Sequence, residues 1–423
     1  MRILWVKAGK LLPVDTGGKI RSYNILKHLA ARHETTLLSY YGGDRDMGYE
    51  QAIQAELPGT RVIHTGALDG STFKRAVDYL GRFPSAAPYA VSKFADAEIK
   101  RIVGVCLQEQ RYDVAICDFL GASMNFPAAS ATPTVLFQHN VESILWQRQA
   151  THEPNWLKRL AFKIEAAKMT RYEARAVGKF THVIAVSDAD RDLLGKMLKP
   201  MTDAARISVV PTGVDLAQYR AETGESATEP LVMFLGSMDW EPNIDGVDYF
   251  HREIWPRIKQ AVPNARFRIV GRNPHPRIQR LAASSKEGDV EVTGTVPSVI
   301  EHLREAAVFV VPLRIGGGTR LKIYEAMAMG KATVSTTIGA EGLDVNHGQD
   351  ILLADDPDSF AQSTIALLQD TTRRQQMEQA AAAQAAKFDW PLIADRFEEV
   401  LALAVRQHST ATQAAPTAVP VNA

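Results

Sequence analysis

A short predicted helix that follows three glycines carries the side chains best suited to hold a phosphorylated ligand. Its first turn contains Arg320 and Lys322, at a place where unpaired backbone N–H groups already concentrate positive charge. Two cations there repel the helix terminus unless an anion lies against them. The preceding loop lets a ligand approach the backbone closely, and its residues are Gly316, Gly317, Gly318 and Thr319. We therefore predict a diphosphate at this helix start.

Glu325 is the only carboxylate in the same stretch, "RLKIYEAMAM", whose residues after Lys322 are otherwise apolar. An apolar helix is typical of the protein interior, so this carboxylate needs a partner. Ribose hydroxyls of a bound nucleotide could donate hydrogen bonds to it. The alternative is an ordinary pair between Lys322 and Glu325, three residues apart, beside a mobile glycine loop. Two cations together with one isolated carboxylate favour the nucleotide site.

The elements that must position these residues alternate along the chain between apolar β-branched runs and helical patterns. This alternation predicts an α/β fold with parallel sheets covered by helices on both faces. In the first half the predicted strands are "RILWVKA", "TTLLSYY", "RVIHT", "DVAICDF", "TVLFQH" and "HVIAVS". In the second half they are "LVMFLGS", "RFRIVGR", "VEVTGT", "VFVVPL", "ATVST" and "ILLA". We expect two doubly wound, Rossmann-like domains.

The polar segment "PTGVDLAQYRAETGESATEP" lies between the two sets of strands and indicates an interdomain linker. We place an N-terminal domain at 1–220 and a C-terminal domain at 221–388. A helix over 389–407 begins where Pro391 must break the preceding one, and we expect it to pack back on the N-terminal domain. The small, polar residues 408–423 predict a disordered tail.

Composition excludes several classes of protein. The 423 residues carry 48 basic and 48 acidic side chains, which argues against a nucleic-acid partner for the protein as a whole. Only Cys106 and Cys117 are present, and their spacing fits neither a metal nor a redox pair, so a reducing cytosol is expected. The apolar run at the start is too short for a signal peptide, and no segment reaches the ~20 apolar residues that span a bilayer.

The segment "GGGTRLKIYEAMAMGKATVSTTIGAEGL" resembles the nucleotide-sugar-binding part of retaining glycosyltransferases with the GT-B fold, family 4. Further similar motifs occur in the order that this family has them: "DTGGKIRS", "VLFQHNVES", "HVIAVSDAD", "VVPTGVD", "FLGSMDWEPN", "IVGRNP" and "GTVPS". The resemblance implies a nucleoside-diphosphate sugar as substrate, with uridine commoner than guanosine as its base. It implies no cofactor and no metal ion. The donor would lie on the C-terminal domain and the acceptor mainly on the N-terminal one, facing each other across a cleft.

Two departures from that family affect the phosphate site. The family usually has two glutamates eight positions apart, and here the first falls on Gly317 while Glu325 corresponds to the second. It also has an arginine and a lysine where this sequence has Ser237 and Pro242. More of the phosphate charge must then fall on Arg320 and Lys322, which we expect to neutralise the leaving group during catalysis.

Strand ends supply the remaining candidate residues of the N-terminal domain. Gly17 and Gly18 open a helix after the first strand, which is either a ligand-binding loop or a simple tight turn. His139 ends an apolar strand, where ligands of open α/β sheets gather. By resemblance it binds a sugar hydroxyl and helps stabilise charge at the reacting carbon; the alternative is a satisfied histidine beside an Asn140 helix cap. Weaker candidates are Asp118, Asp15 and Lys19.

In the C-terminal domain, strand ends place Gly236, Ser237 and Gly271 toward the donor. By resemblance the loop "GTVPS" supplies backbone contacts to the base from Val296. Backbone recognition leaves no side-chain pattern, so the base is not read from the sequence.

Two surface stretches concern the acceptor. The segment from Glu142 to Phe180 is rich in Lys and Arg and contains Trp156, Leu157 and Leu160. It is either a basic amphipathic surface that contacts anionic membrane or a solvated helix packed by its apolar face. The stretch "STFKRAVDYLGRFPSAAPYAVSKF" is a candidate for the acceptor side.

The sequence thus predicts a cytoplasmic, metal-independent enzyme, with peripheral contact to the inner membrane as an open alternative. It would move a sugar from a nucleoside diphosphate to a glycan or lipid-linked acceptor with retention of configuration. The resemblance to members of bacterial surface-polysaccharide clusters implies that pathway. Alternatives are a nucleotide-sugar epimerase or hydrolase of the same fold, and a non-catalytic nucleotide-sugar-binding partner, which the missing glutamate at Gly317 would allow.

Overall fold

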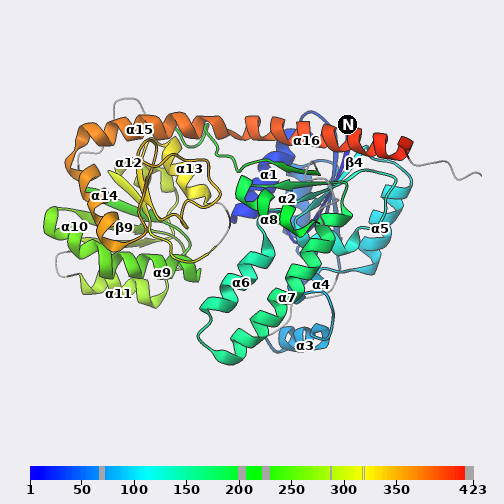
Figure 1. Ribbon diagram of the computed structural model, residues 1–423, viewed down its shortest axis with the longest axis horizontal. Coiled ribbons are helices and arrows are strands. Elements are labelled where there is room, and N and C mark those ends of the chain that lie inside the picture. Colours follow the sequence, from blue (N-terminus) through cyan, green and yellow to red (C-terminus); the bar gives the residue numbers. More distant parts are fainter. Residues whose placement is uncertain are drawn as a thin grey trace, which may run out of the picture. The chain divides into compact units, whose positions relative to one another are not determined.

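The computed structural model describes residues 1–65, 72–198, 206–221, 229–285, 288–316, 318 and 320–414 (Figure 1). Internal contacts divide the chain into two compact units. Unit 1 contains Met1–Pro211 and Ile393–Ala423, and unit 2 contains Thr212–Leu392. Each unit is built on one parallel sheet, so the prediction of an α/β fold with two doubly wound domains is confirmed.

The sheet of unit 1 has seven strands in the order β3-β2-β1-β4-β5-β6-β7, all parallel. The strands are β1 (Arg2–Ala8), β2 (Glu34–Tyr41), β3 (Arg61–His64), β4 (Val114–Asp118), β5 (Thr134–Phe137), β6 (His182–Ala185) and β7 (Ile207–Val209). The helices before residue 211 are α1 (Gly17–Ala30), α2 (Met47–Glu56), α3 (Thr72–Arg82), α4 (Tyr89–Ser92), α5 (Ala97–Gln108), α6 (Glu142–His152), α7 (Trp156–Lys179) and α8 (Asp188–Met197). The sequence predicted every strand of this sheet except the three-residue β7.

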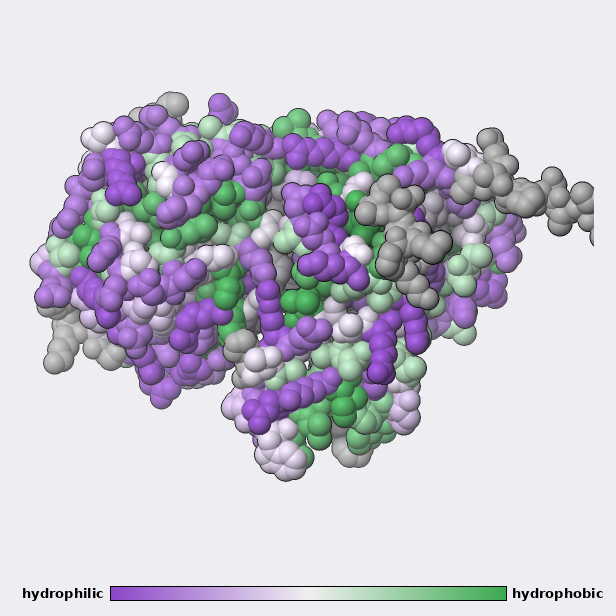
Figure 2. All heavy atoms as spheres, in the orientation of Figure 1, coloured by the Kyte–Doolittle hydropathy of each residue, from purple (hydrophilic) through white to green (hydrophobic). Residues whose placement is uncertain are grey.

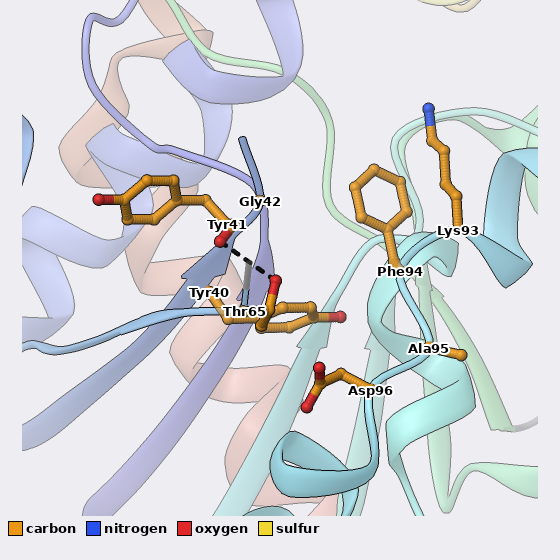
Figure 3. Close-up of a pocket in the computed structure, with 8 residues that line it drawn as sticks. All are labelled: Tyr40, Tyr41, Gly42, Thr65, Lys93, Phe94, Ala95 and Asp96. Atoms are coloured by element: carbon orange, nitrogen blue, oxygen red, sulfur yellow. Dashed lines mark hydrogen bonds between the residues drawn. The ribbon is translucent and has the colours of Figure 1, made fainter. Parts of the chain in front are cut away.

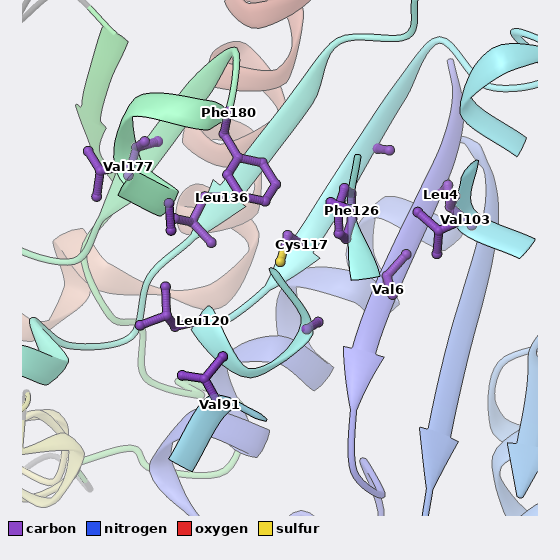
Figure 4. Packing of buried hydrophobic residues seen from close by; sticks show 14 of the residues in the cluster. Leu4, Val6, Val91, Val103, Cys117, Leu120, Phe126, Leu136, Val177 and Phe180 are labelled. Atoms are coloured by element: carbon purple, nitrogen blue, oxygen red, sulfur yellow. The ribbon is translucent and has the colours of Figure 1, made fainter. Parts of the chain in front are cut away.

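One face of this sheet packs against α5 and α7. Side chains alternate between the two faces of a strand, so Leu4 and Val6 of β1 share this face. They belong to a continuous buried cluster, shown in Figure 4, that includes Leu4, Val6, Val91, Val103, Cys117, Leu120, Phe126, Leu136, Val177 and Phe180. Each fully buried Val, Leu or Phe contributes about 1.5–3 kcal/mol. The cluster therefore fixes both helices on the sheet.

The opposite face packs against the last helix, α16 (Trp390–Ala414). Phe397 of this helix stacks on Trp5 with ring centroids 5.6 Å apart and contacts Phe137 edge-on at 5.0 Å. The helix also continues past residue 408, where the sequence predicted a disordered tail to begin, so that start was wrong. Ser409 and Thr410 donate hydrogen bonds to the carbonyls one turn back, which satisfies their hydroxyls within the helix.

The sheet of unit 2 has six parallel strands in the order β10-β9-β8-β11-β12-β13. They are β8 (Leu231–Leu235), β9 (Arg266–Val270), β10 (Val290–Gly294), β11 (Val308–Val311), β12 (Ala332–Ser335) and β13 (Leu352–Leu353), as the sequence predicted. The helices are α9 (Glu241–Tyr249), α10 (Trp255–Ala261), α11 (Pro276–Ser284), α12 (Val299–Glu305), α13 (Leu321–Ala328), α14 (Pro357–Gln369) and α15 (Thr371–Ala385), with a π-helical turn at Phe250–Ile254.

Part of the predicted interdomain linker is an integral part of unit 2. Val214 N donates to the carbonyl of Phe388 (2.8 Å), and Trp390 N donates to that of Val214 (3.2 Å). Ala221 N donates to the carbonyl of Ala328, at the end of α13 (3.0 Å). The segment 212–221 therefore packs against the elements that surround the predicted phosphate site.

Two glycines allow the ends of β8 and β9 to approach each other closely. Gly236 follows β8 and Gly271 follows β9, and Gly236 N donates to the carbonyl of Val270 (3.0 Å). A Cβ atom added to Gly271 would lie 1.7 Å from the carbonyl oxygen of Gly236, which no side chain can tolerate. Small residues at this edge are therefore required by the backbone itself.

We expect Gly271→Ala to lower the free energy of unfolding by roughly 1–3 kcal/mol, the usual cost of overpacking. Gly195→Ala is the matched control, because an added Cβ on this residue of α8 has no atom within 4 Å. Removing a helical glycine there should instead stabilise the protein by up to about 1 kcal/mol. Urea unfolding curves measure both changes. Equal stability of the two variants would contradict the close approach at Gly271.

Candidate functional site

The carboxyl ends of the parallel strands in unit 2 bring the predicted donor residues to one edge of the sheet. Gly236 and Ser237 follow β8, Gly271 follows β9, and Val296 lies two residues beyond the end of β10. Gly271 N donates to the carbonyl of Gly294 (3.3 Å), which ties the last two of these ends together. Ligands of open α/β sheets bind at such an edge.

The glycine loop before α13 has a conformation that needs glycine. Gly316 and Gly318 have φ angles of 122° and 78°, in the left-handed region. Gly317 and Thr319 lie outside the described residues. Arg320 is the N-cap residue of α13, and its guanidinium donates to the carbonyl of Gly318 (2.8 Å) and lies 5.4 Å from the Trp240 ring. The buried side chain of Arg320 therefore holds the backbone of the glycine loop at Gly318.

Lys322 lies in the first turn of α13, two residues after Arg320. Its amine has a neutral hydrogen-bond partner. Its Nζ donates to Oδ1 of Asn243 (3.1 Å) and lies 4.2 Å from the centroid of the Phe234 ring. Asn243 is held by its own bond to the carbonyl of Ser237 (2.8 Å). Burial and, to a smaller extent, the charge of Arg320 lower the pKa of Lys322 to about 7, and the attraction of Glu325 limits this decrease. Among the described residues Lys322 forms no ion pair, so this buried amine can accept an anionic ligand.

Glu325 has a partner from another segment, Tyr219, whose hydroxyl forms a hydrogen bond with it. Burial raises the pKa of Glu325 to about 7, while Lys322 and Tyr219 act to lower it. Lys322 and Glu325 attract each other through space, but each makes its hydrogen bond elsewhere. A simple surface pair between them therefore does not describe the site.

Sequence reasoning missed three side chains of this edge: Tyr219, Asn243 and Arg272. Arg272 donates through Nε to Oγ of Ser237 (3.0 Å). Ser237 stands where the family usually has an arginine, so Arg272 places a guanidinium beside that position. Arg272 directly follows Gly271 in "IVGRNP", and its place after a strand-end glycine could have indicated it. Tyr219 lay in the segment assigned to the linker and gave no signal, whereas Asn243 ends the motif "FLGSMDWEPN", in which only Gly236 and Ser237 were taken as donor-binding residues.

In unit 1, a buried polar network occupies the carboxyl ends of three neighbouring strands. Lys7 of β1, Asp118 of β4 and His139 beyond β5 share one face because alternate residues of a strand do so. Asp118 accepts from Lys7 Nζ (2.9 Å), from Trp5 Nε1 (2.9 Å) and from Ser22 Oγ (3.0 Å). The positive charge of Lys7 and the bond from His139 hold the pKa of this carboxyl well below its usual range, against the effect of burial. Lys7 was missed, although a lysine inside an apolar strand indicates a buried partner.

His139 is held on both sides. Arginine can only donate, so Nδ1 of His139 accepts from Arg21 (3.2 Å), and the proton on Nε2 is donated to Asp118 (2.8 Å). Burial lowers the pKa of His139 to about 4, although Asp118 acts to raise it. The ring is therefore neutral at physiological pH, so it donates a hydrogen bond to Asp118 but carries no imidazolium proton with which to act as a general acid. Its predicted role near the reacting carbon stays a prediction.

The glycine loop of unit 1 is linked to this network. Gly17 and Gly18 open α1, and the carbonyl of Gly18 accepts a hydrogen bond from Ser22, which also bonds Asp118. The weaker candidates Asp15 and Lys19 pair with each other at 2.9 Å. The loop is thus positioned by the same residues that hold His139.

The predicted cap of α6 by Asn140 was wrong. The N-cap residue is Val141, and the carboxylate of Glu173 from α7 accepts from the backbone N–H groups of Glu142 and Ser143, both at 2.9 Å. Glu173 also accepts from Gln138 (3.1 Å). The first N–H groups of α6 are therefore satisfied by Glu173, about 30 residues away in sequence, and not by the neighbouring Asn140.

A cavity of about 110 Å³ opens at the ends of β2 and β3 (Figure 3). Its lining residues are Tyr40, Tyr41, Gly42, Thr65, Lys93, Phe94, Ala95 and Asp96. Lys93 and Phe94 lie together on one side of it and belong to the stretch that the sequence indicated for the acceptor. Asp96 is engaged as the cap of α5, where it accepts from Glu98 N (2.9 Å) and Ile99 N (3.0 Å).

Two sequence models of known families match the chain. One, described as glycosyltransferase family 4, matches residues 16–218, and the other, glycosyl transferases group 1, matches residues 229–370. Together with the two parallel α/β sheets, these matches define a glycosyltransferase with the GT-B fold. The chain belongs to glycosyltransferase family 4, as its motifs predicted.

Relatives of known sequence are distant. An uncharacterized 44.6 kDa protein in the cps region of Klebsiella pneumoniae is 26% identical over 139 residues, which are 32% of this chain and 36% of that protein. The phosphatidyl-myo-inositol mannosyltransferase of Mycolicibacterium smegmatis is 26% identical over 258 residues, 59% of this chain and 64% of the relative. The chain thus matches about one third to two thirds of the length of these curated relatives.

Solved structures are similar over nearly their whole length. Anabaena HepE in complex with UDP has a TM-score of 0.66 at 17% identity and covers 95% of this chain and 100% of its own. Sucrose-phosphate synthase from Thermosynechococcus elongatus has a TM-score of 0.68 at 16% identity, with 97% and 99% covered. Likeness at these identities shows the fold.

The lowered pKa of Lys322 predicts that diphosphate binding takes up a proton. At about pH 8 an amine with a pKa of about 7 is mostly neutral, and a bound anion favours its charged form. Affinity for UDP should therefore fall as the pH rises above 7. Glu325, with a pKa of about 7, is already mostly ionised at this pH and contributes little.

Calorimetric titration of UDP in buffers of different ionisation enthalpy measures this uptake. Lys322→Arg is the control, because a guanidinium keeps its charge and should bind UDP without taking up a proton. The same uptake in wild type and Lys322→Arg would show that another group is responsible.

Proposed function

We propose that this protein transfers a hexosyl group from a nucleoside-diphosphate sugar to the hydroxyl of a glycan or lipid-linked acceptor, with retention of configuration. The observation that carries the proposal is the pair Arg320 and Lys322 at the start of α13, beside the Glu325–Tyr219 pair. Two buried cations at the start of a helix suit a diphosphate, and the carboxylate suits a ribose. Uridine is the proposed base, which the UDP bound in Anabaena HepE supports.

In this reaction the bond between the sugar C1 and the diphosphate oxygen breaks, and the acceptor oxygen forms a new bond to C1 on the same face. The departing diphosphate gains negative charge and can take the acceptor proton. Arg320, Lys322 and the N–H groups of α13 would stabilise that charge, the kind of electrostatic effect that is usually the largest in catalysis. Arg272 beside Ser237 would supply a third cation.

The acceptor side is proposed for unit 1. The cavity lined by Lys93 and Phe94 combines an aromatic ring with a cation, a combination that suits a sugar ring next to a phosphate. The Klebsiella relative lies in a cps region, and the Mycolicibacterium relative is named for a phosphatidyl-inositol acceptor. These two names support our proposal of a glycan or lipid-linked acceptor used in surface-polysaccharide synthesis.

Two other functions follow from the same nucleotide site. An epimerase or hydrolase would consume the donor without any acceptor, and a non-catalytic partner would bind the donor without turnover. The second is favoured by one observation, glycine at position 317 in place of the family glutamate. Incubation of UDP-sugars with and without acceptor glycans separates the three, because only the transferase needs both.

Thermal-shift titration with UDP and with uridine tests the diphosphate site. Arg320→Ala and Lys322→Ala should each weaken UDP binding by ~1.5–3 kcal/mol, the range of charge-assisted hydrogen bonds, and leave uridine binding nearly unchanged. Arg272→Ala should weaken UDP binding in the same direction. Its matched control is Arg266→Ala at the other end of β9, where the side chain pairs with Glu229. Equal losses for UDP and uridine would overturn the assignment.

His139→Ala should lower kcat by ~10²-fold with UDP affinity changed by less than about 1 kcal/mol, because the residue belongs to unit 1 and the diphosphate to unit 2. His139→Gln should recover part of the rate, since its amide can donate to Asp118 and accept from Arg21. Steady-state kinetics measure both variants. Wild-type turnover in a folded His139→Ala protein would exclude any role of the network in transfer.

A further inference from the structure

The start of α7 exposes large apolar side chains to solvent. Trp156, Leu157, Leu160 and Ile164 are 64%, 58%, 53% and 37% exposed. Trp156, Leu160 and Ile164 are four residues apart in turn, so they follow one side of the helix. Apolar residues at this spacing normally face a protein core, and here they face outward.

The same stretch is strongly basic. Lys158, Arg159 and Lys163 are all exposed, and no acidic residue lies between Trp156 and Ile164, so these residues carry a formal charge of +3. Among the described residues, none of the three cations forms an ion pair. The local charge contrasts with the zero net charge of the whole chain.

Helix α3 extends the surface. Lys168 of α7 donates to the carbonyl of Phe83, just after α3 (2.6 Å), and lies 4.5 Å from its ring. Glu165 of α7 accepts from the backbone N–H of Tyr89 (2.7 Å). These contacts hold α3 beside α7, and α3 exposes Val77 (53%) and Leu80 (68%).

We call this surface the α3–α7 tip; it consists of Val77, Leu80, Trp156, Leu157, Lys158, Arg159, Leu160, Lys163 and Ile164. It holds six of the eleven large hydrophobic residues that are exposed in the described part of the chain. Figure 2 shows green apolar side chains gathered over these helices in the lowest part of the view, with purple hydrophilic ones among them. Such a concentration marks an interaction surface.

We propose that the α3–α7 tip docks on an anionic lipid surface. Exposed cations that form no ion pair among the described residues match the negative charge of anionic headgroups, which attract each nearby Lys or Arg. Tryptophan and leucine beside them can enter the boundary between headgroups and acyl chains, as in interfacial helices. In the described part of the chain, no helix has the length and hydropathy of a membrane span. The proposal does not depend on which donor the enzyme uses.

Flotation of the full-length protein with vesicles tests this docking. The wild type should float with vesicles that contain phosphatidylglycerol, bind much less to pure phosphatidylcholine, and be released by salt. Lys158→Ala with Lys163→Ala should reduce partitioning to the anionic vesicles by roughly thirtyfold, from the usual contribution of two surface cations. Leu157→Glu with Leu160→Glu should remove it altogether.

Met47→Glu is the matched control, because Met47 is also 53% exposed in unit 1 but lies on α2. It should float like the wild type, and all variants should keep the wild-type thermal shift with UDP, which separates docking from donor binding. The proposal fails if the wild type does not float with anionic vesicles or if Met47→Glu loses as much binding. It also fails if the wild type forms a dimer that only the tip variants dissociate, because the surface would then bind a second copy.

Discussion

Parallel pairing of strands is the constraint on which both candidate sites depend. When all strands of a sheet run in the same direction, their carboxyl ends meet at one edge, and the residues just beyond them become neighbours. In unit 1 this constraint brings Lys7 to Asp118, 111 residues away in sequence, and His139 to Asp118, 21 residues away. In unit 2 it brings the residues after β8, β9 and β10 to one edge of the sheet, where Asn243, beyond β8, bonds Lys322 of α13. No local sequence pattern would join these residues without the sheet.

The two edges treat buried charge differently. In unit 1 the cation of Lys7 lies 2.9 Å from the carboxylate of Asp118, and the histidine is neutral, so the network is complete without a ligand. In unit 2 the amine of Lys322 donates to the neutral amide of Asn243 and, within the described residues, forms no ion pair, although Glu325 attracts it through space. Burying the charged amine of Lys322 without an ion pair destabilises the protein. Binding of an anionic ligand would offset this cost. The difference suits a positioning role for the first edge and a binding role for the second.

The sequence revealed what depends on local pattern. Apolar β-branched runs identified nearly every strand, and Arg320, Lys322 and Glu325 attracted attention because their charges are unusual on an apolar helix. Residues whose roles depend on tertiary contacts were missed. Glu173 caps α6 from a different helix, and Tyr219 reaches Glu325 from a segment whose polar composition is typical of a linker. Arg272, whose place after a strand-end glycine could have indicated it, lies against Ser237.

The pairing of Val214 with Asp389 has a consequence for how the chain closes on itself. Unit 2 is an insertion of about 180 residues between the two parts of unit 1, and this pairing joins its first and last segments. Without it, seating α16 on unit 1 would require closing a loop of that length. Once unit 2 has folded, the effective loop is only a few residues long, which reduces the entropy cost of closure by about 3 kcal/mol. The pairing of Val214 with Asp389, formed entirely within unit 2, therefore lowers the entropy cost of bringing Phe397 onto Trp5 in unit 1.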